Sequence, residues 1–228
     1  MNDRLPDVIE LEFAENPDPR CACVLVLDAS GSMNGAPIEA LSRGLSELRD
    51  ELGEDPVARN RVELSVVTFG TGANVAQDWT TVQEFEPPAL EATGATYLGE
   101  ATETALRLLE ERKDTYRQAG VTYYRPWMLL MTDGVPHGED QATLAEASSK
   151  LRGAAADRRV VILPVAVGEH GSVGYLESFT GTKAKKLDGL RFAELFQWLS
   201  ASLAQLSHSN PGDKVALPAA DNWSEVVG

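Results

Sequence analysis

Short, uninterrupted apolar runs that end in polar residues are the feature that most constrains how this chain can fold. Cys23–Leu27 is one such run and is followed by Asp28, while Trp127–Met131 is another and is followed by Thr132 and Asp133. Continuous apolar runs of this length are typical of strands that are covered on both faces, as in parallel sheets. Longer segments with helical spacing separate them, so we expect strands and helices to alternate.

The helical segments are indicated by apolar residues placed three and four positions apart, which form one stripe along a helix. Ala36–Leu52 is the clearest example, and Pro37 suits its first turn. The same spacing predicts three further helices, over Tyr97–Arg112, Gln141–Ala155 and Phe192–Leu206.

Four more strands are predicted, over Arg61–Phe69, Ala73–Trp79, Val160–Val167 and Ala184–Leu187. The second has polar flanks and the last is short and basic, so both are expected at edges of the sheet. Pro164 lacks a backbone donor, which predicts a bulge or a strand end there. Together, the alternating strands and helices predict an α/β fold in three α/β/α layers around a mostly parallel sheet.

A single domain of this type accounts for most of the 228 residues. We expect residues 1–20 to form an N-terminal extension, residues 21–206 the domain, and residues 207–228 a tail without periodicity that either packs on the domain or is partly mobile.

The cellular location is inferred from what the sequence lacks. The first 20 residues contain no apolar stretch suited to a signal peptide, and no window reaches the ~20 apolar residues of a membrane helix. Cys21 and Cys23 are interpreted as small buried strand residues, because two cysteines this close make a poor disulfide or zinc site. These features predict a soluble protein of a reducing compartment, the cytoplasm.

The charge balance limits the classes of partner. With 35 acidic and 20 basic residues the net charge is −15, which repels nucleic acid and anionic membrane surfaces. We therefore expect neither as a partner. The charge is compatible with cations or basic partners, although its simplest role is to keep the protein soluble.

The residues that carry chemistry follow the predicted strands. Ligand sites in such sheets lie beyond the carboxyl ends of the strands, so Asp28 and Asp133 are expected close together. Three oxygen-rich loops provide two carboxylates and three hydroxyls, from Asp28, Ser30, Ser32, Thr96 and Asp133. Oxygen ligands suit hard divalent cations. Because only two of these groups are anionic, a bound cation should attract an external carboxylate or phosphate oxygen.

Each of these loops also has a simpler structural interpretation. The turn after Asp28 and the residue Thr96 are both placed where a helix cap is common, and Asp133 with Gly134 is a common turn pair. The coincidence of three separate loops favours the metal site over three unrelated turns.

The pattern Asp28-x-Ser30-x-Ser32, with Thr96 and Asp133 later in the chain, resembles the metal-ion-dependent adhesion site of von Willebrand factor A domains. The resemblance covers about residues 21–206. It implies a Rossmann-like three-layer fold with one antiparallel edge strand. It also implies a Mg²⁺ site, with Mn²⁺ or Ca²⁺ as alternatives, in which these five residues bind the ion directly or through water.

A narrower resemblance is to bacterial stand-alone A domains of the TerY type, which are associated with tellurite resistance. It is carried by Val26–Met33, Arg125–Trp127, Met131–Pro136 and Pro211–Lys214. This resemblance implies a role in stress signalling beside a protein kinase and a protein phosphatase.

The predicted function is a non-catalytic, metal-dependent module that binds an acidic or phosphorylated group of a protein partner. A phosphatase-like hydrolase with Asp28 as nucleophile is the alternative, but such enzymes use a second acid two positions on, where this chain has Ser30. A purely structural metal site also stays open.

Overall fold

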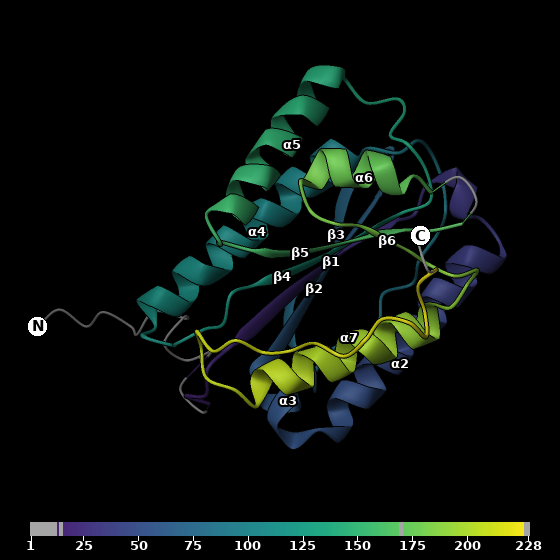
Figure 1. Cartoon of the computed structure of the whole chain (residues 1–228). Helices are drawn as coiled ribbons and strands as arrows, with labels where there is room; N and C mark the ends of the chain where they lie inside the picture. The colour runs from purple at the N-terminus through teal and green to yellow at the C-terminus, as the bar shows by residue number, and fades with distance from the viewer. Residues whose placement is uncertain (1–12, 14–15, 169–170, 226–228) are drawn as a thin grey trace, which may run out of the picture.

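The computed structural model describes Phe13, residues 16–168 and residues 171–225. Six strands form one sheet in the order β3-β2-β1-β4-β5-β6 (Figure 1). They are β1 (Cys21–Asp28), β2 (Val62–Gly70), β3 (Gly72–Thr81), β4 (Trp127–Thr132), β5 (Val161–Ala166) and β6 (Lys185–Lys186). Only β3 runs antiparallel to its neighbour. The predicted mostly parallel sheet with one antiparallel edge strand is confirmed.

Helices cover both faces of the sheet, which confirms the three layers (Figure 1). One face carries α2 (Ala36–Glu54), α3 (Pro56–Arg61) and α7 (Phe192–Ser207); the other carries α4 (Leu98–Gln118), α5 (Gln141–Ala156) and α6 (Val173–Thr180). The short helices α3 and α6 were not predicted, because one or two turns are too few to show an apolar stripe. Among the helices of the described residues, none is both long and apolar enough to cross a lipid bilayer.

The central strand β1 explains why the sheet is covered on both sides. All eight of its residues are buried. Its alternate side chains enter two cores: Cys21, Cys23, Leu25 and Leu27 pack toward α2 and α7, and Ala22, Val24 and Val26 toward α4 and α5. Both cysteines are free and buried, as predicted from their place in an apolar run.

The expectation for Pro164 was wrong, because β5 continues through it in unbroken register with β4. The N–H groups of Val161 and Val167 both donate toward the β4 side, each at 2.8 Å. Backbone donors alternate in direction along a strand, so the missing donor at Pro164 falls on the opposite side. On that side the neighbour of β5 is β6, which pairs with it only from Val165 onward, so the missing N–H of Pro164 removes no hydrogen bond from the sheet.

The described part of the tail, residues 208–225, packs on the domain. It runs back along α7 toward β6 (Figure 1), and the indole Nε1 of Trp198 donates to the Pro218 carbonyl at 2.8 Å. Trp223 is buried against Trp198, with ring centroids 5.4 Å apart. An antiparallel bridge between Leu187 and Ser224 then covers the short edge beside β6.

Two glycines of α2 provide a matched test of how α2 packs on α7. A Cβ on Gly44 would lie 2.5 Å from a ring carbon of Phe196, whereas a Cβ on Gly53 would meet no atom within 4 Å. We expect Gly44→Ala to lower the free energy of unfolding by about 1–3 kcal/mol through overpacking. Gly53→Ala should raise it by about 0.5–1 kcal/mol, because alanine favours the helix. Urea denaturation measures both, and a neutral Gly44→Ala would contradict the packing described.

A second test concerns Asp55, the N-cap of α3, which accepts hydrogen bonds from the N–H groups of Val57 at 2.8 Å and Ala58 at 3.0 Å. Partial burial raises the pKa of Asp55, but these bonds and His208, at 2.9 Å, outweigh burial and lower it overall. A carboxylate whose pKa is lower in the folded than in the unfolded chain stabilises the fold at pH values above its unfolded pKa of ~3.9. This stabilisation is lost as the pH falls through the folded pKa.

Asp55→Ala should therefore cost about 1 kcal/mol at neutral pH, and the difference should shrink below about pH 4. Asp55→Asn is the control, because asparagine caps a helix nearly as well. Chemical denaturation at several pH values measures the effect, and an equal loss in both variants would argue against the cap.

Candidate metal-binding site

The candidate site lies where β1 and β4 end side by side. Leu27 is paired with Met131, so the residues that follow these two strands emerge at the same edge of the sheet. The chain moves from β1 outward to β2 and β3 and then returns to β4 on the other side of β1. Ligand sites of open α/β sheets form at such a reversal, beyond the carboxyl ends of the strands.

The Asp28 side chain joins the two loops at this edge. Its Oδ1 accepts the Ser30 N–H at 2.8 Å, and its Oδ2 accepts the Thr132 hydroxyl at 2.6 Å and the Asp133 N–H at 3.4 Å. Asp28 is only 1% exposed. The carboxylate therefore forms the buried floor of the site, and protein donors hold it in a single orientation.

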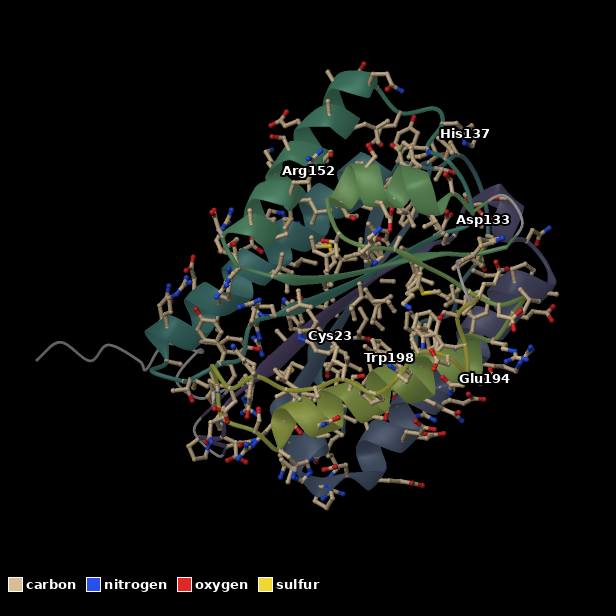
Figure 2. The ribbon with its side chains drawn as sticks, viewed as in Figure 1. Cys23, Asp133, His137, Arg152, Glu194 and Trp198 are labelled. Carbon is tan, nitrogen blue, oxygen red and sulfur yellow. The ribbon has the colours of Figure 1, made fainter. Side chains whose placement is uncertain are left out.

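Above this floor, hydroxyl and carboxylate oxygens continue toward the solvent. The Ser30 and Ser32 hydroxyls are 3.0 Å apart, and the Ser32 hydroxyl donates to Asp133 Oδ1 at 2.8 Å. Adjacent ligands of an octahedral Mg²⁺ with bonds of ~2.0–2.1 Å are about 2.9 Å apart. Ser32 is exposed and Asp133, labelled in Figure 2, is partly exposed, so the site is open to solvent on this side.

Thr96 is brought to the same edge by backbone contacts on both sides. The loop before it is tied to the first loop, where the Gly31 N–H donates to the Gly94 carbonyl at 3.1 Å. The Thr96 N–H donates to the carbonyl of His137, on the loop that follows β4, at 3.2 Å. Thr96 is 3% exposed, and its hydroxyl makes no hydrogen bond within the part of the chain that the structure describes.

Gly94 allows the Thr96 loop to approach this closely. Its φ is +81°, and a Cβ there would lie 2.3 Å from the Thr71 hydroxyl oxygen. That hydroxyl accepts the Ala95 N–H at 2.9 Å. Any larger residue at position 94 would displace the loop, because both the backbone conformation and the space require glycine.

The structure therefore links four of the five predicted residues by side-chain hydrogen bonds and holds the fifth, Thr96, by its backbone. Within the described residues, no three His, Cys, Asp or Glu side chains are placed to hold a metal. A cation here would depend on the hydroxyls in addition to two carboxylates. An all-oxygen set that includes the unpartnered hydroxyl of Thr96 fits a hard divalent cation.

The electrostatics of Asp28 also favour a bound cation. Burial raises the pKa of Asp28, the hydrogen bonds from Ser30 and Thr132 lower it, and the charge of Asp133 raises it further, so the net shift is upward. Burial and a like charge both disfavour the carboxylate. A cation between Asp28 and Asp133 would offset both penalties.

Two residues that support the site were not among the predicted ligands. Thr132 is the last residue of β4 and lies level with Asp28, the last residue of β1, and this place at the strand end is a signal in the sequence. Glu139 accepts the N–H groups of Gly99 at 2.8 Å and Glu100 at 2.7 Å and so fastens the loop that follows β4 to the first turn of α4. Some 40 residues separate these partners, and no local pattern reveals the contact.

A three-layer α/β/α fold with one antiparallel edge strand and an oxygen-lined edge at β1 and β4 defines a class of ligand-binding α/β domains. The family profile of the von Willebrand factor type A domain matches residues 23–193. The chain belongs to this family.

Several proteins are similar to this chain. An uncharacterised protein of Synechocystis sp. is 27% identical over 190 residues, which span 77% of this chain and 41% of that protein. The von Willebrand factor type A structure from Catenulispora acidiphila has 19% identity and a TM-score of 0.61, over 82% of this chain and 43% of the other. The chain thus spans less than half the length of both. The vWF domain of the type V pili tip protein Mfa5 from Porphyromonas gingivalis has 10% identity and a TM-score of 0.63, over 86% of this chain and 99% of that domain.

Glu139 offers a test of how the site is held together. Glu139→Ala should lower the free energy of unfolding by about 1 kcal/mol, because two helix N–H groups lose their acceptor. Amide hydrogen exchange should accelerate at Gly99 and Glu100. Asp140→Ala is the matched control: it removes the same charge from the next position, where the side chain makes no capping bond. If both variants exchange alike, charge and not the Glu139 contact holds the loop.

Proposed function

We propose that this chain is a non-catalytic protein-binding module that docks an acidic or phosphorylated partner group at a metal-ion-dependent adhesion site. Asp28, Ser30, Ser32, Thr96 and Asp133 would hold the ion, Mg²⁺ in the first instance, with Mn²⁺ or Ca²⁺ as alternatives. A divalent cation would supply positive charge and a coordination position open to an anionic oxygen. The observation that carries the proposal is the hydrogen-bonded chain from Asp28 to Asp133, in which Asp28 accepts the Ser30 N–H, the Ser30 and Ser32 hydroxyls are bonded to each other, and Ser32 donates to Asp133.

The distribution of charge supports docking at an external anion. The Asp28 carboxylate already accepts three protein donors, so its negative charge is partly neutralised before any cation binds. Ser30, Ser32 and Thr96 contribute no formal charge. A cation held by such a set keeps affinity for one more anionic oxygen, and the exposed Ser32 and partly exposed Asp133 leave room for it.

A binding role is favoured over hydrolysis by the groups around Asp28. An aspartyl nucleophile of the phosphatase type works with a second acid two positions on, which serves as general acid or base. Position 30, where a phosphatase of the aspartyl type would have its second acid, is a serine that contacts Ser32. His137 lies on the adjacent loop with an exposed side chain (Figure 2), and only its backbone carbonyl contacts the Thr96 loop.

The cellular role proposed is that of the TerY type, in the bacterial cytoplasm and in signalling linked to tellurite or other stress. The segments that support it are Val26–Met33, Arg125–Trp127, Met131–Pro136 and Pro211–Lys214. A protein kinase and a protein phosphatase are the partners that this resemblance suggests.

The first experiment is isothermal titration of chelator-stripped protein with Mg²⁺ and Mn²⁺. We expect one saturable site that Asp28→Ala abolishes and Ser30→Ala weakens on the order of tenfold, as for loss of one supporting group at a metal site. Asp140→Ala should bind the metal as the unmodified protein does, because the Asp140 carboxylate is not part of the hydrogen-bonded chain from Asp28 to Asp133. Unchanged binding in Asp28→Ala would refute the site, and circular dichroism should show that this edge substitution leaves the fold intact.

The two alternatives give different results. Magnesium-dependent turnover of a generic phosphomonoester, lost in Asp28→Ala, would establish a hydrolase. A purely structural metal would stabilise the fold by about 2.7 kcal/mol when its concentration is 100 times the Kd, and this would raise the melting temperature. Chelation would then lower the melting temperature and leave partner capture unchanged.

A further inference from the structure

A second pocket lies at the end of the sheet opposite to the candidate metal site. Its volume is about 350 Å³, and its apolar lining comes from the start of β4, the start of β5, the end of α7 and the tail: Tyr124, Trp127, Val161, Leu206, Val215 and Leu217. Trp127 opens β4, and Asp133 follows its last residue. The pocket and the metal site are therefore at the two ends of one strand, about 20 Å apart at ~3.3 Å per residue.

The charged residues of this pocket favour an anion. Arg125 and Lys214 both line it and are exposed, and neither forms an ion pair with any described residue. The one carboxylate in the lining, Asp213, is occupied by its own turn, where it accepts the N–H of Asn210 at 2.9 Å and its side-chain amide at 3.3 Å. In a chain of net charge −15, two cations against one carboxylate beside an apolar hollow leave a local net positive charge.

The backbone beside the pocket favours a peptide over a small molecule. Residues 214–217 have no regular secondary structure, and their N–H and C=O groups make no hydrogen bonds to other described residues. Such a segment can pair with an extended peptide in the manner of an added strand. Leu217 is 39% exposed at the rim, where a second apolar side chain could contact it. The volume is at the low end of the ~300–1,000 Å³ of small-molecule sites, which suits one or two side chains.

We propose that this pocket is a second protein-binding site, which takes an extended peptide segment with acidic and apolar residues in alternation. An apolar side chain enters the hollow against Trp127 and Tyr124. A neighbouring carboxylate lies between Arg125 and Lys214, and the peptide backbone pairs with residues 214–217. The site needs no metal, so it functions independently of the site at Asp28 and allows the domain to hold two partners at opposite ends.

The test uses two pools of short fluorescein-labelled peptides and fluorescence anisotropy with the full chain. One pool alternates apolar residues with Glu, and the other alternates the same apolar residues with Lys. We expect the Glu pool to bind at least about tenfold more tightly. The double variant Arg125→Glu, Lys214→Glu should weaken its binding by about tenfold, equivalent to about 1.4 kcal/mol. Both substitutions are at exposed positions, and circular dichroism verifies the fold.

The control is the double variant Arg43→Glu, Lys185→Glu, which changes the net charge equally at two exposed cations outside the pocket. It should bind the Glu pool as the unmodified chain does, as should Asp28→Ala in the presence of chelator. Equal binding of both pools, no binding of either, or an equal loss in the control would overturn the proposal. Loss of Glu-pool binding by the unmodified chain on addition of chelator would do so too and would assign the peptide to the metal site, which separates this proposal from the previous one.

A last readout identifies the class of ligand. Backbone amide shifts on titration with the Glu pool should concentrate at Arg125 and at residues 212–217. Competition by succinate at concentrations comparable to the peptide would show a small-anion site and would refute peptide docking.

Discussion

The structure depends on the burial of β1 between two parallel neighbours and two layers of helices. No side chain of this strand reaches solvent, so its residues can be apolar throughout and the polar residue that ends it, Asp28, is carried into the edge of the core. A buried carboxylate is costly unless donors or a cation compensate it. The loops around Asp28 are arranged as that cost requires: three donors reach it from two chain segments.

The same constraint explains why the site is divided between a rigid floor and an open mouth. Thr132 and Asp28 are fixed because β1 and β4 pair in register up to the preceding residue. Ser32 lies in a short 3₁₀ turn, Gly31–Met33, with its hydroxyl exposed. Binding groups on short loops held by a sheet combine positional accuracy with access, which is the usual arrangement in open α/β folds.

The sequence predicted those features whose physical cause is local or periodic. The apolar run Cys23–Leu27 and the stripe of Ala36–Leu52 each determine their own element. The rule on strand ends then sufficed to place Asp28 beside the loop of Asp133. Helix α3 was missed although Asp55 and Pro56 are a cap and first-turn pair, because six residues carry no period.

Contacts between distant segments could not be predicted. Glu63, buried on β2, accepts a hydrogen bond from Arg112 Nε at 2.7 Å and another from the Tyr116 hydroxyl, with partners about 50 residues away. The burial of Trp223 against Trp198 likewise depends on the path of the tail across α7. No spacing rule relates such residues, because the fold and not the local chain brings them together.

The position of β4 limits how the two ends of the domain can influence each other. All six residues of β4 are buried, and β4 pairs on both sides in continuous register. A shift of this strand by one residue would turn every side chain to the wrong face, so β4 acts as a spacer of fixed length. Coupling between sites requires an element with two alternative arrangements, and a locked central strand is a poor candidate. Two ligands bound at its opposite ends would therefore bind additively, as sites this far apart usually do.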